Sequence, residues 1–99
     1  MAKPKLTPFD VVEVLDTPES QAAYLNVVLS EDDPAAFLAA LGTVCRAQGM
    51  TRIAKDAGLG RESLYKALGG GAAPSLETTL KVLHALGLKV ALQPDGMNG

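Results

Sequence analysis

The side chains best suited to chemistry cluster between Met50 and Leu68, and their types suit contacts with a nucleic acid. Arginine and lysine neutralise phosphates, and the arginine fork also matches O6 and N7 of guanine. Hydroxyl groups and helix N-termini contact phosphate oxygens. The candidate contact residues are Thr51, Arg52, Arg61, Glu62, Ser63, Tyr65 and Lys66. The sequence therefore predicts a surface for double-stranded DNA in this stretch.

Apolar residues of the same stretch are spaced as two short helices joined by a tight turn would require. Gly58 lies where the first helix must end, with a positive φ that costs glycine little. Ala54 is small at the position where the second helix crosses closest. The remaining apolar contact positions are Ile53, Ala57, Leu59, Leu64 and Ala67. This pattern predicts a helix-turn-helix over residues 50–68; the alternative is an ordinary helical hairpin with a glycine turn.

The second helix of such a unit lies in the major groove with its N-terminal residues at the base edges. Arg61 is its first residue and the best candidate for reading a guanine, with a phosphate contact as an equal alternative. Ser63 is short enough to touch a base or a phosphate. Thr51 and Arg52 begin the first helix, which crosses the sugar-phosphate backbone, so their donors suit a phosphate.

Three further side chains of the second helix have two interpretations each. Glu62 could accept from a cytosine amine, but a carboxylate here also favours the helix N-terminus. Lys66 lies one turn further on and is better placed for phosphate than for base. Tyr65 could stack or hydrogen-bond at the DNA backbone, or pack half-buried against the body of the domain.

Helix start and stop signals predict five helices in all. Thr17-Pro18 and Asp33-Pro34 each combine an N-cap with proline at the first helical position, and the first of these helices is about 12 residues long. Thr51 is expected to cap the first helix of the motif, and Ser75 the last helix, which Gly87 closes. The inward-facing positions outside the motif are Ala22, Leu25, Val28, Leu29, Phe37, Leu41, Val44, Cys45, Leu76, Leu80 and Leu83.

Two segments could be short strands in an otherwise all-α domain, Phe9–Leu15 near the start and Leu88–Leu92 near the end. The first could instead be an extended docking segment. The second could pair with its symmetry mate or with the first, because a lone strand leaves its backbone unpaired. We expect a loose arm over residues 1–8, a flexible loop over residues 69–74 and a mobile tail over residues 94–99.

Length and composition fit one small domain over residues 1–99. The chain is 47% hydrophobic but contains only two Tyr and two Phe, so its core is aliphatic, which favours helices. The net charge of −2 argues mildly against DNA. Residues 1–49 carry three basic and seven acidic side chains, however, whereas residues 50–99 carry six basic and four acidic. The motif lies in the basic half, and local potential matters more for docking than the total.

Several function classes are disfavoured. No apolar run is long enough to span a membrane, and the first residues have no signal-peptide core. A single cysteine fits a reducing cytoplasm, and one Cys with one His cannot build the usual zinc site. No nucleophile, base and orienting group come together, and the glycine run Gly69–Gly71 lacks the features of a phosphate loop. We expect a cytoplasmic, non-enzymatic protein without cofactor or metal.

Three segments carry a resemblance to a known family: AAYLNVVL (Ala22–Leu29), GMTRIAKDAGLGRESLYKAL (Gly49–Leu68) and TTLKVLHALGLKV (Thr78–Val90). Over Phe9–Leu92 the chain resembles the addiction-module antidote proteins, small antitoxins related to the HigA-type, lambda-repressor-like helix-turn-helix group. The resemblance implies a five-helix fold, a RelE-like toxin as partner, and repression of the shared promoter. Reading a pseudo-palindromic operator would require a homodimer.

The chain departs from the family pattern at two places. Gly60 stands where members usually carry Ser or Thr, so a hydroxyl that could reach a phosphate is missing. Ala72-Ala73-Pro74 stands where members tend to have Gly-Asn-Pro, which puts a polar contact from that loop in doubt.

Two other functions remain open from the sequence. The fold could serve as a protein-interaction module that neutralises its toxin without significant DNA binding, which suits the acidic first half. It could also be a stand-alone, phage-type transcriptional repressor without a toxin partner.

Overall fold

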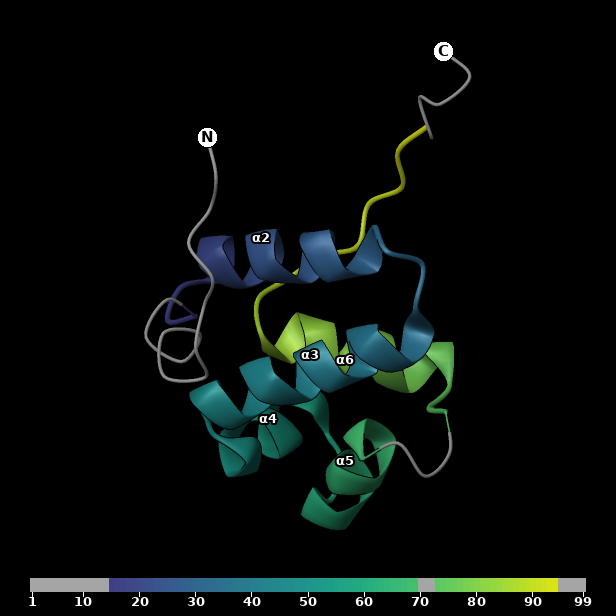
Figure 1. The fold of residues 1–99 in the computed structure, drawn as a ribbon. Coiled ribbons are helices and arrows are strands. Elements are labelled where there is room, and N and C mark those ends of the chain that lie inside the picture. The colour runs from purple at the N-terminus through teal and green to yellow at the C-terminus, as the bar shows by residue number, and fades with distance from the viewer. Residues whose placement is uncertain (1–14, 70–72, 95–99) are drawn as a thin grey trace.

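The structure is a computed structural model that describes residues 15–69 and 73–94. Five helices make up most of the described chain, so the prediction of an all-α protein is confirmed over these residues. The helices are α2 (Pro18–Leu29), α3 (Pro34–Gln48), α4 (Met50–Ala57), α5 (Arg61–Leu68) and α6 (Leu76–Ala85). Figure 1 shows α2 along one side of the molecule and α5 at the opposite side, with α3, α4 and α6 between them.

Three helices begin where their capping residues predict. The Ser20 amide donates to Thr17 Oγ1 at 3.1 Å, and the Thr17 amide donates to Ser20 Oγ at 3.3 Å, which completes a capping box. The Ala36 amide donates to an Asp33 carboxylate oxygen at 3.2 Å at the start of α3. At the start of α6, the Thr78 amide donates to Ser75 Oγ at 3.1 Å.

The expected cap at Thr51 is wrong, because α4 begins one residue earlier and its N-cap is Gly49. This glycine also ends α3 and has φ 101°, so the chain changes direction within a single residue. Thr51 consequently falls inside the first turn of α4, where its side chain is exposed and makes no capping hydrogen bond.

The C-terminal strand predicted at Leu88–Leu92 is absent from the structure: residues 88–94 follow α6 as irregular chain. A strand needs a ladder partner, and no described segment pairs with these residues. The other candidate strand, Phe9–Leu15, lies outside the described residues except for Leu15. The expected arm over residues 1–8 and most of the expected tail over residues 94–99 also lie outside them, as do residues 70–72 of the expected loop.

The hydrophobic core is centred on α3. Leu41, Val44 and Cys45 are fully buried there, as predicted from their spacing. Ile53 from α4, Leu64 from α5 and Val82 from α6 complete the core with side chains that are at most 1% exposed. Most of these side chains are aliphatic, which agrees with the composition.

Two expected inward positions at helix ends are wrong. Leu76 is 72% exposed and Leu29 is 51% exposed. Each occupies the first or last position of its helix, where the helix extends past the core, so the helical period no longer predicts burial. Gly87 does close α6, with φ 82° and hydrogen bonds from the Gly87 and Leu88 amides back to the His84 and Leu83 carbonyls.

Leu15 fixes the point at which the described chain enters the core. Its side chain is 1% exposed, and its carbonyl oxygen accepts hydrogen bonds from Gln21 Nε2 at 3.1 Å and Gln48 Nε2 at 2.8 Å. Gln48 is the last residue of α3, so this carbonyl links the chain before α2 to the end of α3. None of the helices in the described part of the chain is long and apolar enough to cross a membrane.

Candidate nucleic-acid interface

The turn between α4 and α5 is built by two glycines. Gly58 ends α4 with φ 72° and ψ 29°, the left-handed conformation that the sequence predicted. The Leu59 amide donates to the Ala54 carbonyl at 2.8 Å, and the Gly58 amide donates to the Lys55 carbonyl at 3.1 Å. These two bonds form a Schellman motif, which satisfies carbonyls at the end of α4. Gly60 is extended and precedes the first residue of α5.

The apolar residues predicted from the spacing lie on the inner sides of α4 and α5, where they are mostly buried. Ile53 and Leu64 are fully buried, and Ala54 is 2% exposed. Ala57 and Ala67 are 9% exposed, and Leu59 in the turn is half-buried. Small alanines at these positions let two short helices approach closely, while Leu64 anchors α5 in the core. The predicted apolar face is therefore confirmed.

The outer side of α5 presents every polar side chain predicted for it. The exposed residues are Arg61, Glu62, Ser63, Tyr65 and Lys66. The guanidinium carbon of Arg61 lies 5.9 Å from the centre of the Tyr65 ring, one turn further along the helix. This cation–π contact orients the arginine from outside the core. Tyr65 is 44% exposed, so its ring is neither buried in the body nor fully free.

The start of α5 is open to solvent. Gly60 supplies no side-chain cap, so no side chain of the N-cap covers the first backbone amides of the helix. These amides, together with the positive end of the helix dipole, favour an anion. Glu62 in the first turn supplies part of that negative charge from within the helix.

The structure places Arg52 in a different setting from Arg61. Its Nη1 donates to Gln48 Oε1 at 3.3 Å, and its Nε lies 3.6 Å from Asp56 Oδ2. Asp56 lies one turn along α4, so helical spacing predicts that pair, whereas Gln48 is the last residue of α3 and comes near only because the chain turns sharply at Gly49. To reach a phosphate, Arg52 must give up these partners. The ion pair with Asp56 is exposed to solvent, so breaking it costs little stability.

The described molecule is strongly divided in charge. Residues 15–45 contain five acidic side chains and no lysine or arginine: Asp16, Glu19, Glu31, Asp32 and Asp33. Residues 46–69 contain five basic side chains and two acidic ones. The positive charge is therefore concentrated on the chain that includes α4 and α5, and the negative charge on α2 and its flanking turns.

The described residues give no support for a metal site or a reactive cysteine. They contain no group of three His, Cys, Asp or Glu side chains that could hold a metal ion. Cys45 is buried, and desolvation raises the pKa of its thiol to about 12 despite the nearby charge of Arg46. His84 is exposed on α6.

Comparisons with known proteins place the chain in a family. The family described as "Probable addiction module antidote protein" matches residues 5–94. An uncharacterised protein of Haemophilus influenzae is 46% identical over 89 residues, which cover 90% of this chain and 92% of the relative. No solved structure matches the chain. Because the family match extends over nearly all of the sequence, the chain belongs to the addiction module antidote family.

Proposed function

We propose that this protein is the antitoxin of a type II toxin–antitoxin pair, which binds a RelE-like toxin and represses their shared promoter. The family match supports an antidote role and hence a toxin partner. The observation that carries DNA binding is the exposed polar face of α5, set behind a glycine turn and anchored by Leu64. In this proposal α4 and α5 form a helix-turn-helix of the lambda-repressor type.

The proposed contacts follow from the positions of the side chains. Arg61 pairs with a guanine while stacking against Tyr65, and Ser63 lies near base or phosphate. Lys66 contacts a phosphate one turn further along. The open amides at the start of α5 and the side chains of Thr51 and Arg52 on α4 hold the phosphate backbone. Glu62 either accepts from a cytosine amine or serves the helix N-terminus.

A single α5 reads only a few base pairs, so we propose that the protein binds DNA as a homodimer. Two copies related by a twofold axis would present their α5 helices to half-sites about 34 Å apart, or a multiple of that distance. The protein acts in the cytoplasm as a binding protein rather than an enzyme.

A second candidate function is toxin neutralisation without significant DNA binding. The charge distribution favours it: the protein as a whole carries −2, and residues 15–45 are entirely acidic among their charged side chains. The family match is compatible with both candidates. It gives no support to the third possibility, a phage-type repressor without a toxin.

A cell assay separates the two candidates. A reporter is fused to the DNA upstream of this chain's gene, and the protein encoded by the adjacent reading frame is expressed from an inducible promoter. The proposal predicts that this chain represses the reporter and relieves growth arrest by its neighbour. Relief without repression would favour the second candidate, whereas repression without relief would support a stand-alone repressor.

A further inference from the structure

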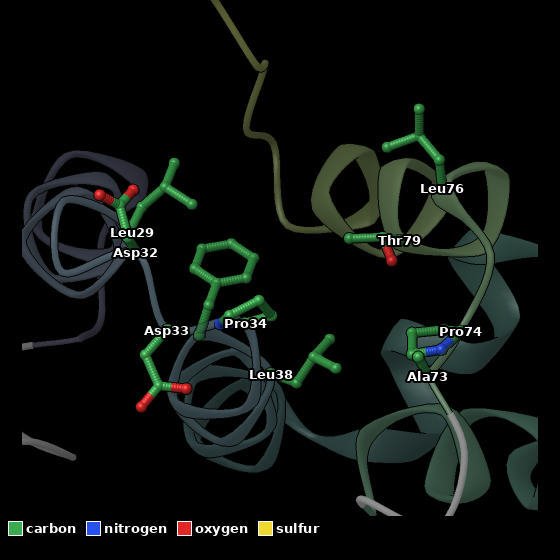
Figure 2. A pocket seen from close by; sticks show the side chains of 10 residues that line it. Leu29, Asp32, Asp33, Pro34, Leu38, Ala73, Pro74, Leu76 and Thr79 are labelled. Atoms are coloured by element: carbon green, nitrogen blue, oxygen red, sulfur yellow. The ribbon is translucent and has the colours of Figure 1, made fainter.

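An open apolar groove lies where the end of α2 meets the starts of α3 and α6 (Figure 2). Its volume is about 490 Å³, within the 300–1,000 Å³ typical of ligand pockets. The apolar side chains that line it are Leu29, Pro34, Phe37, Leu38, Pro74 and Leu76. None of the residues assigned to DNA contact lines this groove, so it needs a separate explanation.

The groove leaves large apolar side chains in contact with water. Leu29 on one side is 51% exposed and Leu76 on the other is 72% exposed, while Phe37 between them is only half-buried. Single exposed leucines are ordinary on a protein surface, but here they border one concave site. Covering that site would bury apolar area that folding alone leaves exposed.

Acidic side chains border the same groove. Asp32 and Asp33 line it from the α2–α3 turn, with their carboxylates at the outer rim, pointing away from Leu38 and Leu76 (Figure 2). Glu31 precedes them in the sequence. Asp32 has φ 57°, and its amide donates to the Leu29 carbonyl at 3.1 Å, so a tight turn fixes the two carboxylates at this end of α2. No described lysine or arginine forms an ion pair with any of the three.

From this combination we infer that the groove is the docking site for the toxin, which inserts an apolar side chain flanked by lysine or arginine. The inference rests on the proposed function. The carboxylates at the groove complement a partner that carries lysine or arginine beside its apolar side chain. A second copy of this chain fits poorly, because it would bring two equally acidic surfaces together.

The position of the groove also allows both partners to bind at once. The α2–α3 turn, which supplies the carboxylates, lies toward the side of the molecule occupied by α2, away from α5 (Figure 1). Neither Arg61 nor Ser63 lines the groove. The antitoxin therefore holds a basic protein and a nucleic acid with oppositely charged parts of its surface.

The test measures binding of the purified protein encoded by the adjacent reading frame. Leu29→Lys places a cation in the groove and is expected to raise the Kd at least about 30-fold, because it removes an apolar contact and repels a basic partner. Leu76→Lys, on the other wall, should do the same. Asp32→Asn keeps a residue that tolerates positive φ, removes one charge, and should raise the Kd about threefold to tenfold at low salt.

Matched controls lie on the same helix. Val27 is 50% exposed, as Leu29 is, but lies about 200° away around α2 and lines no described pocket. Val27→Lys should leave the Kd within about twofold. Glu19→Gln removes a carboxylate from the opposite end of α2 and should behave similarly. Circular dichroism and binding to upstream DNA report whether each variant keeps its fold.

The outcomes separate the inference from the proposed function. If the native protein binds its neighbour and the groove variants bind equally tightly, the groove is not the docking site, although the antitoxin role stands. If the native protein does not bind at all, the antitoxin role fails and the inference with it. If Leu29→Lys instead changes the oligomeric state of the free protein, the occupant is a second copy and the inference is wrong.

Discussion

Arg61 is the side chain on which the proposed DNA recognition depends most. It is the first residue of α5, it is exposed, and its guanidinium lies over the Tyr65 ring without an ion pair to any described carboxylate. A guanidinium held in this way presents its donors to a base without first breaking a salt bridge. Arg52, by contrast, donates a hydrogen bond to Gln48 and forms an ion pair with Asp56.

Arg61→Ala is therefore expected to weaken sequence-specific DNA binding by about 1–3 kcal/mol and to leave toxin binding unchanged. Fluorescence anisotropy on upstream DNA measures the DNA binding, and a pull-down with the protein encoded by the adjacent reading frame measures the toxin binding. Lys81→Ala is the matched control, because Lys81 is an exposed cation of α6 that pairs with Glu77. Equal loss of both activities in Arg61→Ala would refute the division of the surface.

Cys45 reports on the integrity of the core. Its pKa of about 12 means that the native thiol is neutral at pH 8 and is shielded from reagents. A disulfide reagent at pH 8 should label it only as fast as the protein unfolds, and at once in denaturant. Rapid labelling of the native protein would show that the packing around α3 is looser than described.

The raised pKa of the Cys45 thiol also affects the stability of the protein at high pH. Ionisation begins in the unfolded chain near its ordinary pKa and in the folded chain only near 12. The contribution of the neutral thiol to the free energy of unfolding is thus fully present below about pH 9. Urea unfolding should show the free energy of unfolding falling as pH rises from 9 towards 12, and Cys45→Ala should lessen that fall.

At the scale of elements, the junction between α4 and α5 depends on backbone conformation. A Cβ at Gly58 would meet no atom within 4 Å, but its φ of 72° is unfavourable for any other L-residue except Asn or Asp. Gly58→Ala should therefore destabilise the protein by about 1–2 kcal/mol through backbone strain alone. Thermal unfolding measures this as a fall in Tm of about 4–8 °C per kcal/mol.

Gly60→Ser is the contrasting control within the same turn. Gly60 has φ −70° and ψ 153°, which any residue adopts, and the nearest atom to an added Cβ is Ser63 Oγ at 4.0 Å. A serine hydroxyl here can accept the Ser63 amide, so stability should rise by a few tenths of a kcal/mol. A comparable loss in both variants would mean that space, not φ, controls the turn.

The elements that the sequence predicted best are those with local chemical signals. A hydroxyl or carboxylate before proline located the starts of α2 and α3, and glycine located the end of α4. The cap predicted at Thr51 is wrong because Gly49 both ends α3 and caps α4, so α4 begins at Met50 with no linker residue before it. The strand at Leu88–Leu92 was wrong because pairing depends on a partner elsewhere in the chain.

The face of α5 and the apolar groove also differ in how far the sequence predicts them. The face of α5 follows from helical period and one glycine turn, so its exposed side chains could be predicted from the sequence. The groove could not be, because the ends of three helices build it, and Leu29 and Leu76 lie far apart in the chain. Their spacing instead indicated core positions, since a helical period carries no information about where the body of the protein ends.

Across the whole molecule, charge separates the proposed DNA-binding surface from the proposed toxin-binding groove. Five acidic side chains and no basic ones lie between residues 15 and 45, and the basic side chains of residues 46–69 lie mainly on α4 and α5. The net charge of −2 therefore conceals two opposite local potentials. Because the positive charge near α5 is modest, the proposed recognition of DNA requires a dimer.

Sequence-specific DNA binding is tested directly by fluorescence anisotropy of the native protein on labelled DNA from upstream of its own gene, against scrambled DNA, at two salt concentrations. We expect tighter binding to the upstream DNA than to the scrambled DNA, and weaker binding at the higher salt concentration, because phosphate contacts release counterions. Equal weak binding to both sequences, or none, would contradict sequence-specific recognition by α5.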